Sequence, residues 1–194
     1  MSYRIIPVLL LVPLLANLIG CGASLVLGGA TAVSIAHDRR TAGVVLEDQS
    51  IELKAYQALQ NQGQRVGQTH INITSYNGRV LLSGEVETEE LYAWAAQSVS
   101  QIEHVQLVYN ELQIAPPSSL SSRSNDGWIT TKVKSSLLQI GGLPDFDPTR
   151  VKVVTERGVV YLMGLVTEQE GDAVTVTVRR VSGVQQVVKL FEYI

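Results

Sequence analysis

The sequence predicts an α+β fold made of two tandem αββαβ units, each with two helices packed on one face of a three-stranded mixed sheet. Three observations predict it. A glycine-centred hairpin pattern occurs twice, about 80 residues apart. A stripe with helical spacing precedes each hairpin, and a helix with acidic residues in its first turn follows it.

The leading helix of each unit is predicted from a period of roughly 3.6 residues, which marks one buried face. The two stripes align position by position. They consist of Asp48, Ile51, Ala55 and Leu59 in the first copy and of Asp126, Ile129, Val133 and Leu137 in the second. Ser124, Asn125 or Asp126 could cap the second helix, since each side chain can accept a hydrogen bond from a free backbone amide.

The hairpins are predicted over residues 71–86 and 151–166. Asn77-Gly78 is a strong signal for a two-residue turn, because both turn positions need a positive φ. Arg157-Gly158 stands at the same place in the second copy and gives a weaker signal.

A helix and a last strand complete each unit, over residues 87–102 and 105–114 and again over 167–181 and 184–194. Residues 174–178 alternate Val and Thr, so propensity alone favours a strand there. Their alignment with the helix of the first unit overrides that preference and predicts a helix.

These elements place the first domain at residues 46–114 and the second at residues 124–194. Residues 115–123 are rich in Pro and Ser and are expected to be a linker. Residues 21–45 are mostly small and apolar, with a charged stretch at residues 37–40, and we expect a partly disordered tether.

Residues 1–20 are expected to be a lipoprotein signal peptide. Arg4 precedes an apolar stretch that is short for a membrane span of ~20 residues. The stretch ends at Leu18-Ile19-Gly20-Cys21, which resembles the bacterial lipobox and implies cleavage before Cys21 and lipid attachment to it. Gly22 stands where a retention signal would place Asp, which suggests the outer membrane, facing the periplasm. An uncleaved N-terminal helix is the alternative, and the many Gly and Ala residues between positions 22 and 36 disfavour it.

The hairpins share the pattern V-x-L-x-G-x-V, at residues 80–86 and 160–166. This pattern and the αββαβ order resemble the BON domain family of bacterial envelope proteins. Two such units behind a lipobox resemble the dual-BON-domain lipoproteins of the outer membrane, over nearly the whole mature chain. The resemblance implies that the second domain binds anionic, phosphatidylglycerol-like phospholipid and that the protein supports outer-membrane integrity.

Composition argues against several classes of function. The formal net charge of -3 argues against nucleic acid as a partner, which needs a clustered positive surface. Cys21 is the one cysteine, so no intrachain disulfide forms. His37, His70 and His104 each lack a second ligand at helical spacing, so we expect surface histidines, no metal site and no cofactor.

An acidic cluster is the remaining candidate for catalysis. We interpret it as a solvated strand end and the first turn of a helix, because the second copy repeats part of the pattern. No catalytic residues and no enzyme activity are expected. The cluster consists of Glu85, Glu87, Glu89 and Glu90.

The candidate site comes from comparing the outer faces of the two leading helices. The buried stripes agree between the two copies, but the outer faces differ. Ser50 of the first copy corresponds to Trp128 of the second, and Gln60 corresponds to Leu138. An exposed Trp and Leu beside lysines is typical of a helix that enters the headgroup boundary of an anionic bilayer. Burying these two side chains contributes roughly 3–5 kcal/mol. We therefore predict phospholipid binding by one helical face and its flanks, formed by Trp128, Thr131, Lys132, Lys134, Ser135 and Leu138.

Other interpretations stay open from the sequence. Leu143 and Phe146, in the longer helix–strand loop of the second domain, could join the membrane contact. Trp128 could instead pack against the first domain or dock an envelope protein, which would make the chain an interaction adaptor. The exposure of the Trp128 indole tests these readings, because an indole sealed between the domains contradicts membrane contact.

Overall fold

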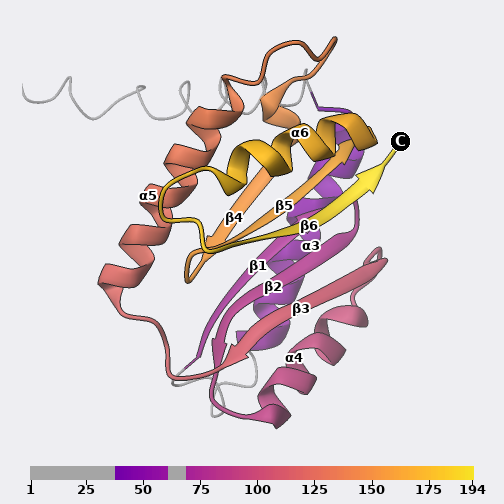
Figure 1. The fold of residues 1–194 in the computed structure, drawn as a ribbon. Coiled ribbons are helices and arrows are strands. Elements are labelled where there is room, and N and C mark those ends of the chain that lie inside the picture. The colour runs from indigo at the N-terminus through magenta and orange to yellow at the C-terminus, as the bar shows by residue number, and fades with distance from the viewer. Residues whose placement is uncertain (1–37, 61–68) are drawn as a thin grey trace, which may run out of the picture. The chain divides into compact units, whose positions relative to one another are not determined.

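The computed structural model describes residues 38–60 and 69–194 (Figure 1). The predicted signal peptide, Cys21 and the tether up to position 37 lie outside the described residues. His37–Ile194 form one compact unit, which contains both predicted αββαβ copies. The predicted α+β fold class is confirmed.

The first domain contains the helices α3 (Ala42–Gln60) and α4 (Glu89–Ser100) and the strands β1 (His70–Tyr76), β2 (Arg79–Val86) and β3 (Leu107–Ile114). The central strand β2 pairs antiparallel with β1 and parallel with β3, so the sheet is mixed, as predicted. The parallel pair requires a crossover connection, and α4 supplies it.

The second domain contains α5 (Leu120–Leu137), the short 3-10 helix η2 (Pro148–Arg150), β4 (Lys152–Glu156), β5 (Val159–Val166), α6 (Glu168–Arg179) and β6 (Gln186–Tyr193). Its strands pair in the same order and directions as those of the first domain. α6 is a helix despite its run of Val and Thr. Thr167 and Glu170 form a capping box at its start, and Val174 and Val178 are buried on its inner face.

The fixed positions of the V-x-L-x-G-x-V pattern face the helices. Val80, Leu82 and Val86 pack with the inner faces of α3 and α4, and the equivalent residues of β5 pack with α5 and α6. All eight residues of the two predicted stripes are buried. Each domain therefore has its own core between its helices and one face of its sheet.

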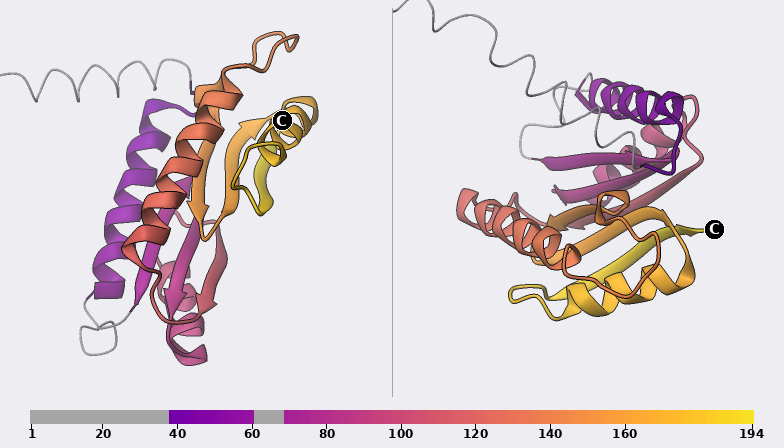
Figure 2. Two further views of the ribbon diagram at one scale, coloured as in Figure 1. Left: turned by 60° about the vertical axis from the view of Figure 1, so that its left-hand side comes forward. Right: turned by 90° about the horizontal axis from the view of Figure 1, so that it is seen from above.

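The x positions of the same pattern face the other domain. Leu81 from β2 and Tyr161 and Met163 from β5 share one buried cluster with Tyr76 and Leu190. The two sheets thus pack face to face, with the helices on the outside (Figure 2). Because each sheet covers the apolar back of the other, two copies remove from water a surface that one copy alone would expose.

The glycine of the pattern allows a close backbone approach. A Cβ on Gly84 would lie 1.9 Å from the carbonyl oxygen of His70, and a Cβ on Gly164 would lie 2.7 Å from that of Arg150. The chain entering each sheet therefore lies closer to the central strand than a side chain would permit.

An aspartate of the leading helix holds the hairpin turn in each domain. Asp48 accepts hydrogen bonds from the backbone N–H groups of Asn77 and Gly78 at 2.8 and 2.9 Å. Asp126 accepts two such bonds at 2.9 Å from residues 157–158. All four turn residues have a positive φ, between 50° and 75°, as the two-residue turns require.

Both leading helices begin earlier than the sequence predicts. Residues 42–45 and 120–123, assigned to the tether and the linker, are helical. The hydroxyl of Thr41 accepts a hydrogen bond from the backbone N–H of Val44, and that of Ser119 accepts one from Ser122. Ser119, rather than a residue between 124 and 126, therefore caps α5. Asp126 lies inside the helix because its carboxylate binds the hairpin turn.

Candidate functional site

The predicted stripe on α5 is exposed to solvent. Trp128 is 62% exposed and Leu138, directly after the helix, is 73% exposed. Thr131 and Ser135, between them, are exposed as well. With 3.6 residues per turn, these four positions point away from the buried face of the helix. Trp128 is not sealed against the first domain, which contradicts the reading in which the sister domain covers it.

The hydroxyl groups of the stripe are used by the helix itself. Thr131 Oγ1 donates to the carbonyl oxygen of Gly127 at 3.0 Å, and Ser135 Oγ donates to that of Thr131 at 2.9 Å. Because both hydroxyl protons are used in these bonds, neither side chain has a free hydrogen-bond donor for the solvent. The face between Trp128 and Leu138 is therefore more apolar than its residue names suggest.

The two lysines beside the stripe differ in their surroundings. Lys134 is exposed, and no ion pair of Lys134 occurs among the described residues. Lys132 is half-buried, and its ammonium group donates to the carbonyl oxygen of Ser182, in the turn after α6. Lys132 thus ties α5 to the rest of its domain, and Lys134 presents its charge beside the stripe.

The loop after α5 contributes less to the exposed face than the sequence suggests. Phe146 is half-buried and packs against the core of the second domain, so only part of its ring is open to an outer contact, which stays a prediction. Leu143 is half-buried, and its contact with a membrane stays a prediction.

Residues 38–40, assigned to the tether, bind both domains, and we call them the strap. Arg39 donates to the two carboxylate oxygens of Glu170 at 2.6 and 2.8 Å and to the carbonyl oxygen of Leu165 at 2.8 Å. Burial raises the pKa of Glu170, but hydrogen bonds from Arg39 and Thr167 outweigh it, so the net pKa lies below the ordinary 4.5. The strap is therefore held to the second domain by a bidentate ion pair.

The next strap residue binds the first domain. Arg40 lies 2.6 Å from both Asp38 and Asp48, and its guanidinium carbon stands 3.7 Å from the centre of the Tyr76 ring. Burial raises the pKa of Asp38, and the hydrogen bonds from Arg40 lower it by more. These contacts fix the start of the folded unit. Sequence reasoning missed them because residues 38–40 were assigned to a tether outside the folded domains.

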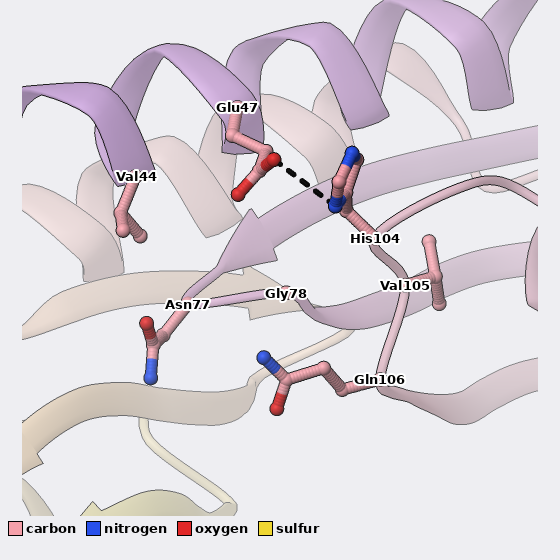
Figure 3. A pocket seen from close by; sticks show the side chains of 7 residues that line it. All are labelled: Val44, Glu47, Asn77, Gly78, His104, Val105 and Gln106. Atoms are coloured by element: carbon pink, nitrogen blue, oxygen red, sulfur yellow. Dashed lines mark ion pairs between the residues drawn. The ribbon is translucent and has the colours of Figure 1, made fainter.

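A small pocket lies at the hairpin turn of the first domain (Figure 3). Its volume is about 240 Å³, below the roughly 300–1,000 Å³ of typical small-molecule sites. His104 Nδ1 lies 3.2 Å from the Glu47 carboxylate, with the two side chains 52% and 42% exposed. His104 is therefore a surface residue, as predicted. The pocket is lined by Val44, Glu47, Asn77, Gly78, His104, Val105 and Gln106.

His70 and Glu85 do not have the surroundings that the sequence predicts. Glu85 is fully buried at an x position of β2 that faces the second domain. His70 is half-buried, and its Nδ1 lies 3.1 Å from Glu85 Oε2 and 3.8 Å from Glu156 Oε1. Burial raises the pKa of Glu156. The prediction of a solvated Glu85 and a surface His70 is wrong, because the second domain covers this end of the first sheet.

No helix among the described residues is both long and apolar enough to cross a membrane.

Comparison with known proteins gives a family match and several relatives. The BON domain family matches residues 47–116 and 125–194. The outer membrane lipoprotein DolP of Haemophilus influenzae is 38% identical over 175 residues, covering 90% of this chain and 89% of that protein. A 21 kDa hemolysin of Actinobacillus pleuropneumoniae is 34% identical over 157 residues, covering 81% and 79%. Among solved structures, the C-terminal domain of CdsD from the type III secretion system of Chlamydia trachomatis matches with 11% identity and a TM-score of 0.30, over 71% of this chain and 96% of that one.

Proposed function

Because the chain belongs to the BON domain family and is a dual-domain, DolP-like protein, we propose that it binds anionic phospholipid through the outer face of α5. As a relative of DolP it is an outer-membrane lipoprotein of the cell envelope. In this proposal Cys21 carries the lipid anchor, the α5 stripe makes the headgroup contact, and no catalytic step takes place.

The exposure of Trp128 is the observation that carries the proposal. The Trp128 indole is 62% exposed, and Leu138 on the same face is 73% exposed. Keeping this apolar surface in water costs free energy, which is recovered when the two side chains enter a bilayer surface. Lys134 lies beside the stripe, where an anionic surface would attract it by about 1 kcal/mol. These groups lie on the face of α5 that no part of the described unit covers.

The lipid anchor explains how a weak contact can matter. Burial of Trp128 and Leu138 supplies roughly 3–5 kcal/mol, which is too little for stable attachment of a free protein. An acyl chain on Cys21 holds the unit near the bilayer, so the second contact becomes intramolecular. The 16 residues between Cys21 and Asp38 span at most roughly 55 Å when extended. The anchor would fix attachment, and α5 would fix orientation and lipid preference.

Vesicle co-sedimentation tests the proposal directly. The chain without residues 1–20 and with Cys21→Ser is used, so that no acyl chain hides the contact. Trp128→Glu is expected to weaken binding to phosphatidylglycerol vesicles at least tenfold, because the indole alone supplies about 2 kcal/mol. The matched control is Leu53→Glu, which changes a residue 58% exposed on α3 and is expected to leave binding unchanged.

Two outcomes would contradict the proposal. Equal binding by the parent chain and Trp128→Glu would remove α5 from the contact. Binding to envelope proteins that depends on Trp128, without vesicle binding by the parent, would favour the adaptor reading. Cells whose only copy of the protein carries Trp128→Glu are expected to release a periplasmic reporter enzyme into the medium. The amount released measures the proposed role in outer-membrane integrity.

A further inference from the structure

Three side chains with metal-binding atoms meet between the two sheets, and we call them the His70 cluster. His70 begins β1, Glu85 lies near the end of β2, and Glu156 ends β4 of the second domain. One ligand atom from each lies within 4.8 Å of the other two. The cluster therefore exists only when both domains are docked.

The spacing of these atoms is close to that of a zinc site. Zn²⁺ binds imidazole nitrogen and carboxylate oxygen at roughly 2.0–2.2 Å, so two ligands of a tetrahedral ion stand about 3.4 Å apart. His70 Nδ1 lies 3.1 Å from Glu85 Oε2 and 3.8 Å from Glu156 Oε1. The two distances from His70 Nδ1 thus lie within about 0.4 Å of the ideal spacing, and all three ligand atoms lie within 4.8 Å of one another.

Other side chains already hold the parts of the cluster that a metal would not use. Arg157 Nη1 lies 3.4 Å from Oε1 of Glu85, and Asn72 Nδ2 donates to Oε2 of Glu156 at 2.8 Å. The opposite oxygen of each carboxylate is the one nearer His70. Outer groups in these places orient the ligands of known metal sites.

Burial and charge also suit a cation. Glu85 and Glu156 are 0% and 5% exposed, and Arg157 offsets only one of their two charges when His70 is neutral. Ser83, two residues before Glu85 on the same face of β2, buries a hydroxyl oxygen without a hydrogen-bond partner among the described residues. The side chain of His70 is 18% exposed, which leaves a route from solvent.

We propose that His70 Nδ1, Glu85 Oε2 and Glu156 Oε1 bind one divalent transition-metal ion, with Zn²⁺ as the ion that best suits one nitrogen and two oxygen ligands. Three protein ligands leave a fourth position for water. The ion links β1 and β2 of the first domain to β4 of the second, so it clamps the two sheets together. This role is independent of the lipid contact on α5.

Equilibrium dialysis against ZnCl₂ tests the site. The full chain is purified in detergent without a histidine tag and carries Cys21→Ser, so that its single thiol cannot bind the metal. One Zn²⁺ per chain is expected, together with a rise in the thermal unfolding midpoint that EDTA reverses. Glu156→Gln keeps the shape of the side chain and is expected to weaken Zn²⁺ binding at least tenfold and to abolish that rise.

Further variants separate the site from general effects. His104→Ala removes the exposed histidine beside Glu47 and is expected to bind Zn²⁺ as the parent does. His70→Gln is expected to behave like Glu156→Gln, and it replaces that variant if Glu156→Gln does not fold in EDTA. Absence of Zn²⁺ binding by the parent at 100-fold molar excess would overturn the proposal. Undiminished binding by both His70→Gln and Glu156→Gln would overturn it as well.

Discussion

The helices α3 and α5 occupy equivalent places in the two domains, yet they carry opposite net charge. α3 contains three acidic residues and one lysine, whereas α5 contains three basic residues and one aspartate. Their inner faces are alike, because both bury four residues at the same spacing and both use the first of these, an aspartate, to hold a hairpin turn. The charge difference between these two helices therefore lies outside their buried faces.

Exposed apolar residues do not distinguish the two helices by themselves. α3 exposes Leu46, Leu53 and Tyr56 at 57–63%, similar to Trp128 on α5. Sequence reasoning missed the α3 residues because it looked only for positions at which the second copy had gained an apolar side chain. An anionic bilayer attracts α5 and repels α3, by about 1 kcal/mol per charge near the surface. Charge thus selects which helix can use its apolar face on such a membrane.

The buried aspartates test how alike the inner faces are, and they give the largest expected effect. Asp126→Ala leaves the buried N–H of Gly158 and the part-buried N–H of Arg157 without their acceptor and is expected to lower the free energy of unfolding by about 3 kcal/mol. Asp48→Ala is expected to cost about 1 kcal/mol more, because Asp48 also accepts from Ser75 at 2.6 Å and pairs with Arg40. Urea unfolding measures both losses. Equal losses would mean that neither the Ser75 hydrogen bond nor the Arg40 ion pair adds to stability.

The strap joins the chain before α3 to the second domain, and Arg39→Met tests that link. Loss of the ion pair with Glu170 is expected to lower the free energy of unfolding by about 2 kcal/mol at pH 7. Because the folded pKa of Glu170 lies below 4.5, its contribution is complete above that pH and is lost as the pH falls through the folded pKa. The parent is therefore expected to lose more stability between pH 5 and pH 3 than Arg39→Met. Parallel pH profiles would contradict a role for the ion pair.

The charge difference between the helices gives the smallest expected effect. Lys134→Gln is expected to weaken binding to phosphatidylglycerol vesicles about fivefold, since one lysine supplies about 1 kcal/mol. Lys54→Gln makes the same change on α3, where the lysine side chain is 46% exposed, and is expected to have no effect. Co-sedimentation at low and high salt measures both. The same loss in both variants would mean that net charge, and not α5, governs the attraction.

Sequence reasoning predicted what depends on local patterns. The buried stripes, the two hairpins with their positive-φ turns and the helical state of α6 follow from spacing and from the internal repeat, and the structure confirms them. The exposure of Trp128 and Leu138 also agrees with the predicted stripe. These features are set by contacts within one domain, so residue spacing and the comparison of the two copies are enough to find them.

Contacts between the domains could not be read from the sequence in this way. Glu85 looks like a solvated strand end in an isolated domain, and only docking of the second sheet buries it. Arg39 forms an ion pair with Glu170, which is 131 positions away in the sequence, so no local pattern marks the pair. A long-range contact within the second domain was missed for the same reason, because the ammonium group of Lys132 donates to the carbonyl oxygen of Ser182, 50 positions along the chain. The signal that could have helped was the first x position of the hairpin pattern, which is apolar in both copies, as Leu81 and Tyr161.

The emission of Trp128 tests the central claim most directly. The chain has two tryptophans, and Trp94→Phe, in the core of the first domain, leaves Trp128 as the one indole. In solution we expect the long-wavelength emission of a solvated indole, and phosphatidylglycerol vesicles should shift it to the blue while phosphatidylcholine vesicles do not. Emission that stays unchanged at saturating phosphatidylglycerol would contradict insertion of α5 into the headgroup layer.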